Sequence, residues 1–371
     1  MPIATNTEPV LTSDAQQQIR QFGLDLGFDE LGFSNIDLSE HEKRLNQWLA
    51  KNFHGEMDYM QRHGTKRSRP QELIEGTCTV ISARMGYLPE NMSDAEAILQ
   101  QADTAYISRY ALGRDYHKLM RNRLQKLSIK IADFLGEFGY RVFTDSAPVL
   151  EKALAEKAGL GWIGKHTNLI QEQTGSWFFL GEIYTDLPLV ESQPATNHCG
   201  SCQKCIDICP TKAIVAPYQL DARLCISYLT IELKEAIPEN LRAQIGNRVY
   251  GCDDCQLVCP WNKFAQLTQE PDFAPRQHLT NRKLLELFDW SEEEFLRYTE
   301  GSAIRRIGYE RWQRNLAVGL GNAQTSPDIL AGLHNKLASS TPMVKEHIEW
   351  AIAQHQNNHT ETTLLNEILN D

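Results

Sequence analysis

The sequence concentrates its thiols in one stretch. Eight of the nine cysteines lie between residues 199 and 259. The first four have the spacing C-x2-C-x2-C-x3-C and end in Cys-Pro, a run that holds iron–sulfur clusters in bacterial ferredoxins. Zinc ribbons use C-x2-C pairs, so a zinc site or a disulfide framework is the alternative. Eight thiolates suffice for two 4Fe–4S clusters, and the candidate ligands are Cys199, Cys202, Cys205, Cys209, Cys225, Cys252, Cys255 and Cys259.

The spacing also predicts which thiols share a cluster. In two-cluster ferredoxins the fourth cysteine of a run ligates the other cluster. The second run is one cysteine short, and Cys225 replaces the missing ligand. This rule gives one set of Cys199, Cys202, Cys205 and Cys259, and a second set of Cys209, Cys225, Cys252 and Cys255.

Asp145 is a candidate general acid. It ends a predicted strand at 140–145 and precedes a turn into a predicted helix that begins near Glu151. A carboxyl group at a strand end beside a pocket can donate a proton if desolvation raises its pKa. The alternative is an aspartate that caps a turn or a helix. The loop at 164–168 offers polar groups that could meet a ligand, or it is a plain loop.

The elements around these residues predict an α+β fold. Strands alternate with helices over 1–190, which indicates an α/β or α+β domain with helices packed against a sheet. The cysteines fall in a second domain at 191–270. From about 277 the chain reads as successive amphipathic helices with short connections, and 271–371 is predicted to be a HEAT-like helical region.

The composition sets the broad class. The chain has 371 residues, enough for two or three domains, with 42% apolar and 23% charged residues. The net charge of −11 argues against a generally nucleic-acid-binding surface, although a local basic patch would suffice. The first residues show no signal peptide, and no stretch approaches the roughly 18 apolar residues of a membrane span. We therefore expect a cytoplasmic protein without a membrane partner.

Over essentially its whole length the chain resembles the epoxyqueuosine reductase family. The blocks that carry the resemblance occur in family order. They are GEMDYM (55–60), RSRP (67–70), YALGRDYHK (110–118), FTDSAPVLEKALAEKAGLGWIGKHTNLI (143–170), SWFFLGEIYTDLPL (176–189), LCISYLTIE (224–232), GCDDCQLVCPWN (251–262) and RNLAVGLGN (314–322).

The resemblance implies a reaction and its cofactors. Members of this family reduce the epoxide of epoxyqueuosine, at the wobble position of tRNA, to the alkene of queuosine, and the oxygen leaves as water. They use base-off cobalamin and two 4Fe–4S clusters, fed by an external electron donor protein. Residues 1–190 would bind the corrinoid, 191–270 the clusters and 271–371 the tRNA. Base-off binding agrees with the incomplete Asp-x-His-x-x-Gly motif at 115–120, where Met120 replaces glycine and His117 is predicted to be a hydrogen-bonding residue.

The resemblance also implies residue roles. Asp145 would be the proton donor. The four arginines Arg305, Arg306, Arg311 and Arg314, interleaved with Tyr309 and Trp312, would bind tRNA, unless they form a solvated helix with Trp312 in its core. His166 stands where many members have Asn. The candidate corrinoid contacts are Arg67, Tyr110, Asp145, Lys165, His166, Thr167, Asn168, Ser176 and Gln256.

Two other functions compete with this hypothesis. A reductive dehalogenase of small organohalides would pair the same cofactors, but those respiratory enzymes usually carry an export signal. A non-catalytic electron-transfer protein would use the clusters alone, and the size of the N-terminal domain argues against it.

Overall fold

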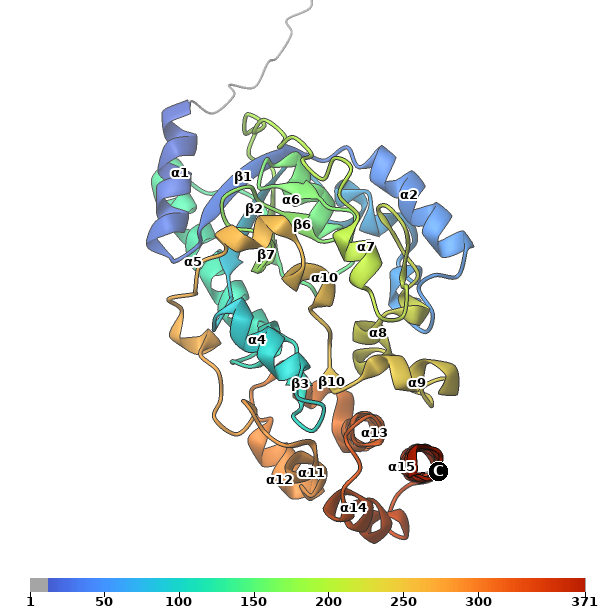
Figure 1. Cartoon of the computed structure of the whole chain (residues 1–371). Coiled ribbons are helices and arrows are strands. Elements are labelled where there is room, and N and C mark those ends of the chain that lie inside the picture. Colours follow the sequence, from blue (N-terminus) through green and yellow to red (C-terminus); the bar gives the residue numbers. More distant parts are fainter. Residues whose placement is uncertain (1–12, 371) are drawn as a thin grey trace, which may run out of the picture.

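A four-stranded antiparallel sheet forms the centre of the N-terminal half (Figure 1). The computed structural model describes residues 13–370, with side chains up to residue 357. The strand order is β1 (Glu30–Asn35), β2 (Thr79–Gly86), β7 (Phe178–Thr185), β4 (Tyr140–Phe143), and every neighbouring pair is antiparallel. The predicted α+β class is therefore observed, and the parallel sheet of an α/β domain is not.

Helices cover both faces of this sheet. Helices α1 (Ser13–Asp25) and α5 (Tyr116–Leu135) pack on one face, and α6 (Glu151–Lys157) packs on the other. Because successive side chains of a strand point to opposite faces, Ile183 joins the core under α5 and Tyr184 joins the core under α6. The same alternation turns Glu182 toward the α6 face.

The cysteine-rich segment packs beside the sheet through short elements. Helix α7 (Lys204–Ile208) contacts α10 (Asp254–Leu257), and a hairpin of β8 (Ile214–Ala216) and β9 (Gln219–Leu220) follows α7. A second hairpin, β5 (Trp162–Ile163) with β6 (Leu169–Ile170), holds the loop at 164–168, which the sequence analysis had left without strands. The other helices before the C-terminal region are α2 (Ser39–Ala50), α3 (Pro70–Leu73), α4 (Met92–Leu99), α8 (Ile226–Ile231) and α9 (Glu239–Ile245).

The C-terminal region is helical, as predicted. It contains α11 (Leu284–Phe288), α12 (Glu292–Tyr298), α13 (Gly308–Gly321), α14 (Pro327–Leu337) and α15 (Pro342–Asn370). Its HEAT-like character stays a prediction.

The largest hydrophobic core joins this region to earlier parts of the chain. Side chains from 105–112 and 222–250 share one core with side chains from 279–352. Strand β3 (Tyr106–Ile107) also pairs in parallel with β10 (Arg248–Tyr250). The segment 222–250 thus packs on the C-terminal helices, and the division at residues 190 and 270 stays a prediction.

No helix in the described part of the chain is long and apolar enough to cross a membrane.

Gly32 allows α6 to approach the sheet. A Cβ atom added at Gly32 would lie 2.0 Å from the carbonyl oxygen of Ala158, just after α6. Because the contact is with backbone, the helix would have to move away. We expect Gly32→Ala to lower the free energy of unfolding by about 1–3 kcal/mol, as overpacking does, and thermal melting checks this. Asn35→Ala in the same strand, which loses two exposed hydrogen bonds, should melt close to wild type. Equal melting of both variants would contradict the packing argument.

Candidate functional site

A pocket of about 660 Å³ opens between the start of α5, the loop after β4 and the segment 301–306. We call it the Asp145 pocket. It brings together two sets of residues that the sequence analysis treated separately, the proposed proton donor and two of the proposed tRNA-binding arginines. Its lining includes Tyr110, Arg114, Asp115, Tyr116, His117, Lys118, Asp145, Arg305 and Arg306.

Asp145 is held by hydrogen bonds from α5. The Tyr116 hydroxyl donates to Asp145 Oδ2 at 2.7 Å, and His117 Nε2 lies 3.2 Å from the same oxygen. Asp145 makes no cap for α6, because the N-cap residue is Leu150 and it forms no side-chain cap. The helix-capping alternative for Asp145 is therefore wrong.

His117 bridges two carboxylates. Its Nδ1 lies 2.6 Å from Asp115 Oδ1, and Asp115 also caps α5 by accepting the backbone N–H of His117. Burial alone would lower the pKa of His117, but the hydrogen bonds to Asp115 and Asp145 raise it to about 9. His117 is thus a protonated imidazolium at neutral pH, and its prediction as a hydrogen-bonding residue is confirmed.

The charge state of Asp145 differs from the expectation. Burial acts to raise the pKa of Asp145, but the hydrogen bonds from His117 and Tyr116 outweigh it and lower the pKa below its ordinary value. The sequence argument considered desolvation and did not foresee these two donors. At neutral pH Asp145 is a carboxylate, and the proton of the pair resides on His117.

Two further carboxyl groups lie behind the Asp145 loop. Asp145 has a φ of 54°, in the left-handed region, and its backbone N–H donates to Glu151 Oε1 at 2.5 Å. Burial raises the pKa of Glu151 to about 7. Glu182 is fully buried in β7, and this burial, together with the nearby Glu151 carboxyl, raises its pKa well above the ordinary value. The carboxyl group of Glu151 therefore holds Asp145 in its left-handed conformation. The sequence pattern had indicated only that Glu151 begins a helix.

Several predicted corrinoid contacts bind protein groups instead of an open space. Ser176, Gln256 and Asn262 form a closed hydrogen-bond network, in which Gln256 Nε2 donates to Ser176 at 3.1 Å. The Lys165 ammonium donates to the carbonyls of Gly200 and Cys202. The predicted residues Ser176, Gln256 and Lys165 therefore fasten the cysteine-rich segment to the N-terminal half.

Other predicted contacts keep free bonding capacity. Arg67 and His166 are buried, yet Arg67 Nε and His166 Nε2 have no hydrogen-bond partner among the described residues. Burial lowers the pKa of His166 to about 4, so its ring is neutral. Thr167 adopts a left-handed φ of 68°, and Tyr110 lines the Asp145 pocket. Buried polar atoms without partners are rare in proteins and indicate an absent group, so these residues fit a bound cofactor.

Lys152 is a residue that sequence reasoning missed. Its ammonium donates to Asn168 Oδ1 at 2.8 Å and to the Thr167 carbonyl at 3.1 Å. Its side chain is exposed at the surface, yet desolvation by the surrounding groups lowers its pKa, while Cys255 and Asp145 act in the opposite direction. Lys152 is thus within electrostatic reach of both the proton site and the second set of cysteines. In the sequence, nothing distinguishes Lys152 from any other lysine at the start of a solvated helix.

The cysteines lie in two groups. Burial raises the pKa of Cys205 to about 11, and the neighbouring Cys259, Cys199 and Cys202 act in the same direction. Cys255 interacts in the same way with Cys225 and Cys209 of its own predicted set, and also with Cys205 of the other set. In the described residues, no three His, Cys, Asp or Glu side chains surround a position for a single metal ion. The assignment of individual thiols to the two clusters stays a prediction.

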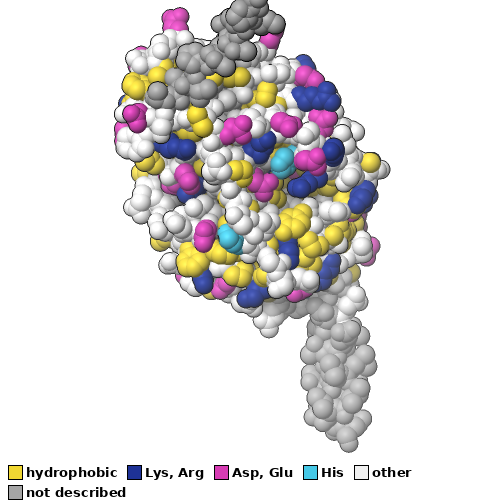
Figure 2. Space-filling model, turned by 90° about the horizontal axis from the view of Figure 1, so that it is seen from above, with side chains coloured by type: hydrophobic (Ala, Val, Ile, Leu, Met, Phe, Trp, Pro, Cys, Tyr) yellow, Lys and Arg dark blue, Asp and Glu magenta, His cyan; other side chains and the backbone are white. Residues whose placement is uncertain are grey.

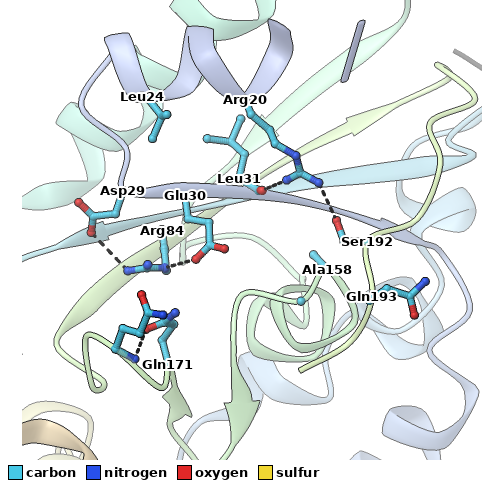
Figure 3. Close-up of a pocket in the computed structure, with 12 residues that line it drawn as sticks. Arg20, Leu24, Asp29, Glu30, Leu31, Arg84, Ala158, Gln171, Ser192 and Gln193 are labelled. Atoms are coloured by element: carbon cyan, nitrogen blue, oxygen red, sulfur yellow. Dashed lines mark hydrogen bonds and ion pairs between the residues drawn. The ribbon is translucent and has the colours of Figure 1, made fainter. Parts of the chain in front are cut away.

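A second cavity, of about 560 Å³, lies where α1 and β1 meet the end of α6 (Figure 3). Arg84 crosses it to Asp29 and Glu30, and Arg20 binds the Leu31 carbonyl and Ser192. Its cations are paired within the protein, and none of the predicted site residues lines it.

Comparisons with known proteins agree with this geometry. Residues 67–146 match the family described as "Epoxyqueuosine reductase QueG, DUF1730", and residues 198–262 match a "4Fe-4S double cluster binding domain". The epoxyqueuosine reductase of Xanthomonas campestris pv. campestris is 59% identical over 92% of this chain and 97% of its own length. That of Escherichia coli K12 is 56% identical over 94% and 91%.

The chain belongs to the epoxyqueuosine reductase family. A solved structure of epoxyqueuosine reductase from Bacillus subtilis, described as having its catalytic aspartate loop swung out of the active site, has a TM-score of 0.83, 27% identity and coverage of 92% and 90%. A structure of the enzyme with a tRNA-Tyr epoxyqueuosine-modified stem loop has a TM-score of 0.76 and 25% identity, and covers 92% of this chain and 99% of that one. The match to the double-cluster domain shows that the cysteine-rich segment of this chain holds two 4Fe–4S clusters.

The four arginines that were predicted to bind tRNA differ in their exposure. Arg305 and Arg306 are exposed at the Asp145 pocket. Arg311 is half-buried and donates to the carbonyls of Ile307, Ile231 and Arg306.

The prediction that Arg314 binds tRNA is wrong. It is fully buried and donates to the carbonyls of Leu229, Leu233 and Glu235, which prevents contact with RNA. Trp312 is fully buried too, so it belongs to the core and stacks no base. Figure 2, which views the molecule from above, shows acidic and basic side chains interspersed on the face that it presents, without a continuous basic field.

Iron content tests the two sets of ligands. Anaerobically purified protein should hold about eight iron atoms, four for each cluster. Cys199→Ala and Cys225→Ala alter different sets, so each should keep about four iron atoms, and the double variant should keep few. Cys78→Ala, outside both sets, should keep about eight. Stoichiometric zinc with little iron would contradict the assignment.

Proposed function

We propose that this chain reduces the epoxide of epoxyqueuosine in tRNA to the alkene of queuosine, with Asp145 as the proton donor. The observation that carries the proposal is the Asp145 pocket. It places the Asp145 carboxylate and its protonated partner His117 beside four cationic side chains and the carboxylates of Asp115 and Asp272. Opening an epoxide leaves an alkoxide, and a nearby acid that protonates it avoids an uncompensated buried anion.

The pocket suits a nucleotide within an RNA loop. The cations Arg114, Lys118, Arg305 and Arg306 line it and can bind backbone phosphates near the reacting base. Arg114 is also paired with Asp272, and Arg306 with Glu232, on the exposed side of the pocket. RNA is read through unstacked bases of single-stranded loops, and the wobble base lies in such a loop. This local basic lining is compatible with a net charge of −11.

Cobalamin is the cofactor proposed for this site. Arg67 Nε and His166 Nε2 are the buried groups available to hold it, together with Tyr110, Thr167, Asn168 and the missed Lys152. Cobalamin supplies the reductive cleavage of the carbon–oxygen bond, and the protein supplies binding, orientation and protons. Cys225 and Cys255 of the second set lie within electrostatic reach of Lys152, and the carbonyl of Cys202 of the first set accepts from Lys165 in the loop at 164–168.

The remaining parts follow from this role. Residues 1–190, 191–270 and 271–371 serve corrinoid binding, electron transfer and tRNA binding, with a HEAT-like helical end. Electrons come from an external donor protein, and the tRNA substrate places the enzyme in the cytoplasm.

Asp145→Asn tests the proton donor. The substitution keeps the shape of the side chain and removes its titrating group. We expect single-turnover reduction of epoxyqueuosine by prereduced enzyme to slow by roughly 10²–10⁴-fold, the usual cost of losing a general acid. Iron content and cobalamin binding should be unchanged, because no cysteine is altered. A near-normal rate with both cofactors bound would assign the proton to another group.

A paired arginine variant tests the tRNA surface. Arg305→Ala with Arg306→Ala should weaken binding of the tRNA stem loop. It should also reduce the slope of log K against log salt by about 0.7 for each phosphate that the variant no longer neutralises. Arg44→Ala, on an exposed position of α2, is the matched control and should change neither quantity. If the double variant binds with wild-type affinity and salt slope, the RNA lies elsewhere.

A further inference from the structure

The reaction proposed above consumes two protons, whereas a single carboxyl group can hold only one. An epoxide that loses its oxygen as water takes up two electrons and two protons. Asp145 is a carboxylate in the resting site, because the hydrogen bonds from His117 and Tyr116 lower its pKa. The pocket must therefore contain a group that loads Asp145 before the first transfer and reloads it before the second.

We propose that His117, oriented by Asp115, is this group: it supplies the protons that Asp145 delivers to the substrate oxygen. The geometry is that of a relay. His117 Nε2 lies 3.2 Å from Asp145 Oδ2, within reach for direct proton transfer, and His117 Nδ1 lies 2.6 Å from Asp115 Oδ1. The inference rests on the proposed function, and it assigns a role to a residue that acts through Asp145.

The surrounding contacts fix the ring in this position. Tyr116 stacks on His117 with ring centroids 4.3 Å apart, and on its own other side Tyr116 stacks on Phe179 at 3.8 Å and 8°. Asp115 is fixed as the N-cap of α5. The imidazole therefore has few alternative orientations, and its two nitrogens point at two different carboxylates.

The proton balance is explicit. The His117 Nε2–H bond breaks to load the Asp145 carboxylate, and the Asp145 Oδ2–H bond then breaks as the alkoxide oxygen takes the proton. Water from the open pocket reprotonates His117, and the second delivery from Asp145 lets the oxygen leave as water. The two electrons come from the external donor through the clusters and the corrinoid.

The local charges support a protonated His117. Asp115 and Asp145 flank the ring, and Glu151 acts in the same direction from the start of α6. Arg306 opposes them from the segment 301–306 through its interaction with Asp115 and Asp145. The charged and titratable groups that face His117 are Asp115, Tyr116, Lys118, Asp145, Glu151, Arg305 and Arg306.

The sign of the pH dependence follows from this arrangement. His117 carries its proton below its pKa of about 9, so the single-turnover rate should be sustained up to that pH and fall above it. Asp115→Asn keeps the helix cap, since Asn caps as well as Asp, but removes one negative partner. The pKa of His117 should then move toward the ordinary value of about 6.5, and the alkaline limb of the rate profile should move down with it.

Two measurements on the holoprotein test the proposal. The first is the ring titration of ¹³C-labelled histidines by NMR with oxidised clusters, in which the His117 signal is identified by its loss in His117→Gln. The second is the single-turnover pH profile. His117→Gln should slow the rate at about pH 8 by roughly 10²-fold or more while iron content and cobalamin binding stay normal. His334→Gln, at an exposed position of α14, should leave both measurements unchanged.

The outcomes separate the two hypotheses. Parallel shifts of the ring titration and the rate profile in Asp115→Asn support the relay. A ring pKa that shifts while the rate profile stays fixed, or a His117→Gln variant with the wild-type profile, overturns it. If wild-type enzyme loaded with both cofactors does not reduce epoxyqueuosine at any pH, the proposed function fails. The ring titration would still show whether His117 carries a proton.

Discussion

The close packing of α6 against the central sheet is the constraint on which the rest of the site depends. The carbonyl of Ala158 rests where Gly32 has no side chain. This approach brings the first turn of α6 under the loop that leaves β4. Glu151 can then hold the amide of Asp145 in a left-handed conformation, and Lys152 can reach the loop at 164–168. If α6 lay farther from the sheet by the radius of one side chain, both of these contacts would be broken.

This arrangement concentrates acidic groups at the Asp145 pocket, and their exposure ranges from fully buried Glu182 to exposed Asp145. Asp115, Asp145, Glu151 and Glu182 cannot all be ionised so close together without a large electrostatic cost. The structure resolves the conflict by giving each carboxyl a different environment. The two nearest α5 share the imidazolium of His117, while the two under the loop are shifted toward their neutral forms. One pair of carboxyl groups is thus ionised and the other is shifted toward the neutral form. The two pairs meet at the left-handed turn of Asp145.

The sequence predicted the elements and the inorganic chemistry well, because those signals are local. Cysteine spacing, strand patterns and helix periodicity each depend on a few neighbouring residues. The interactions that define the Asp145 pocket depend on distant segments. Nothing near Asp145 indicates that His117, some thirty residues earlier, would lower its pKa, and the sequence argument for desolvation therefore gave the wrong direction. Arg314 failed for the same reason: its carbonyl partners lie about eighty residues away.

Buried Arg314 ties the C-terminal helices to the segment that follows the predicted cluster ligand Cys225. Its guanidinium fastens α13 to the carbonyls that end α8, and α8 begins directly after Cys225, a predicted cluster ligand. Helix α13 in turn follows directly on the segment that carries Arg305 and Arg306. The cluster region and the helical end are consequently not interchangeable modules. Exchanging the C-terminal helices for those of another protein would remove part of the hydrophobic core against which Cys225 and Cys252 pack. Recombination at this junction would therefore need to keep both sides together.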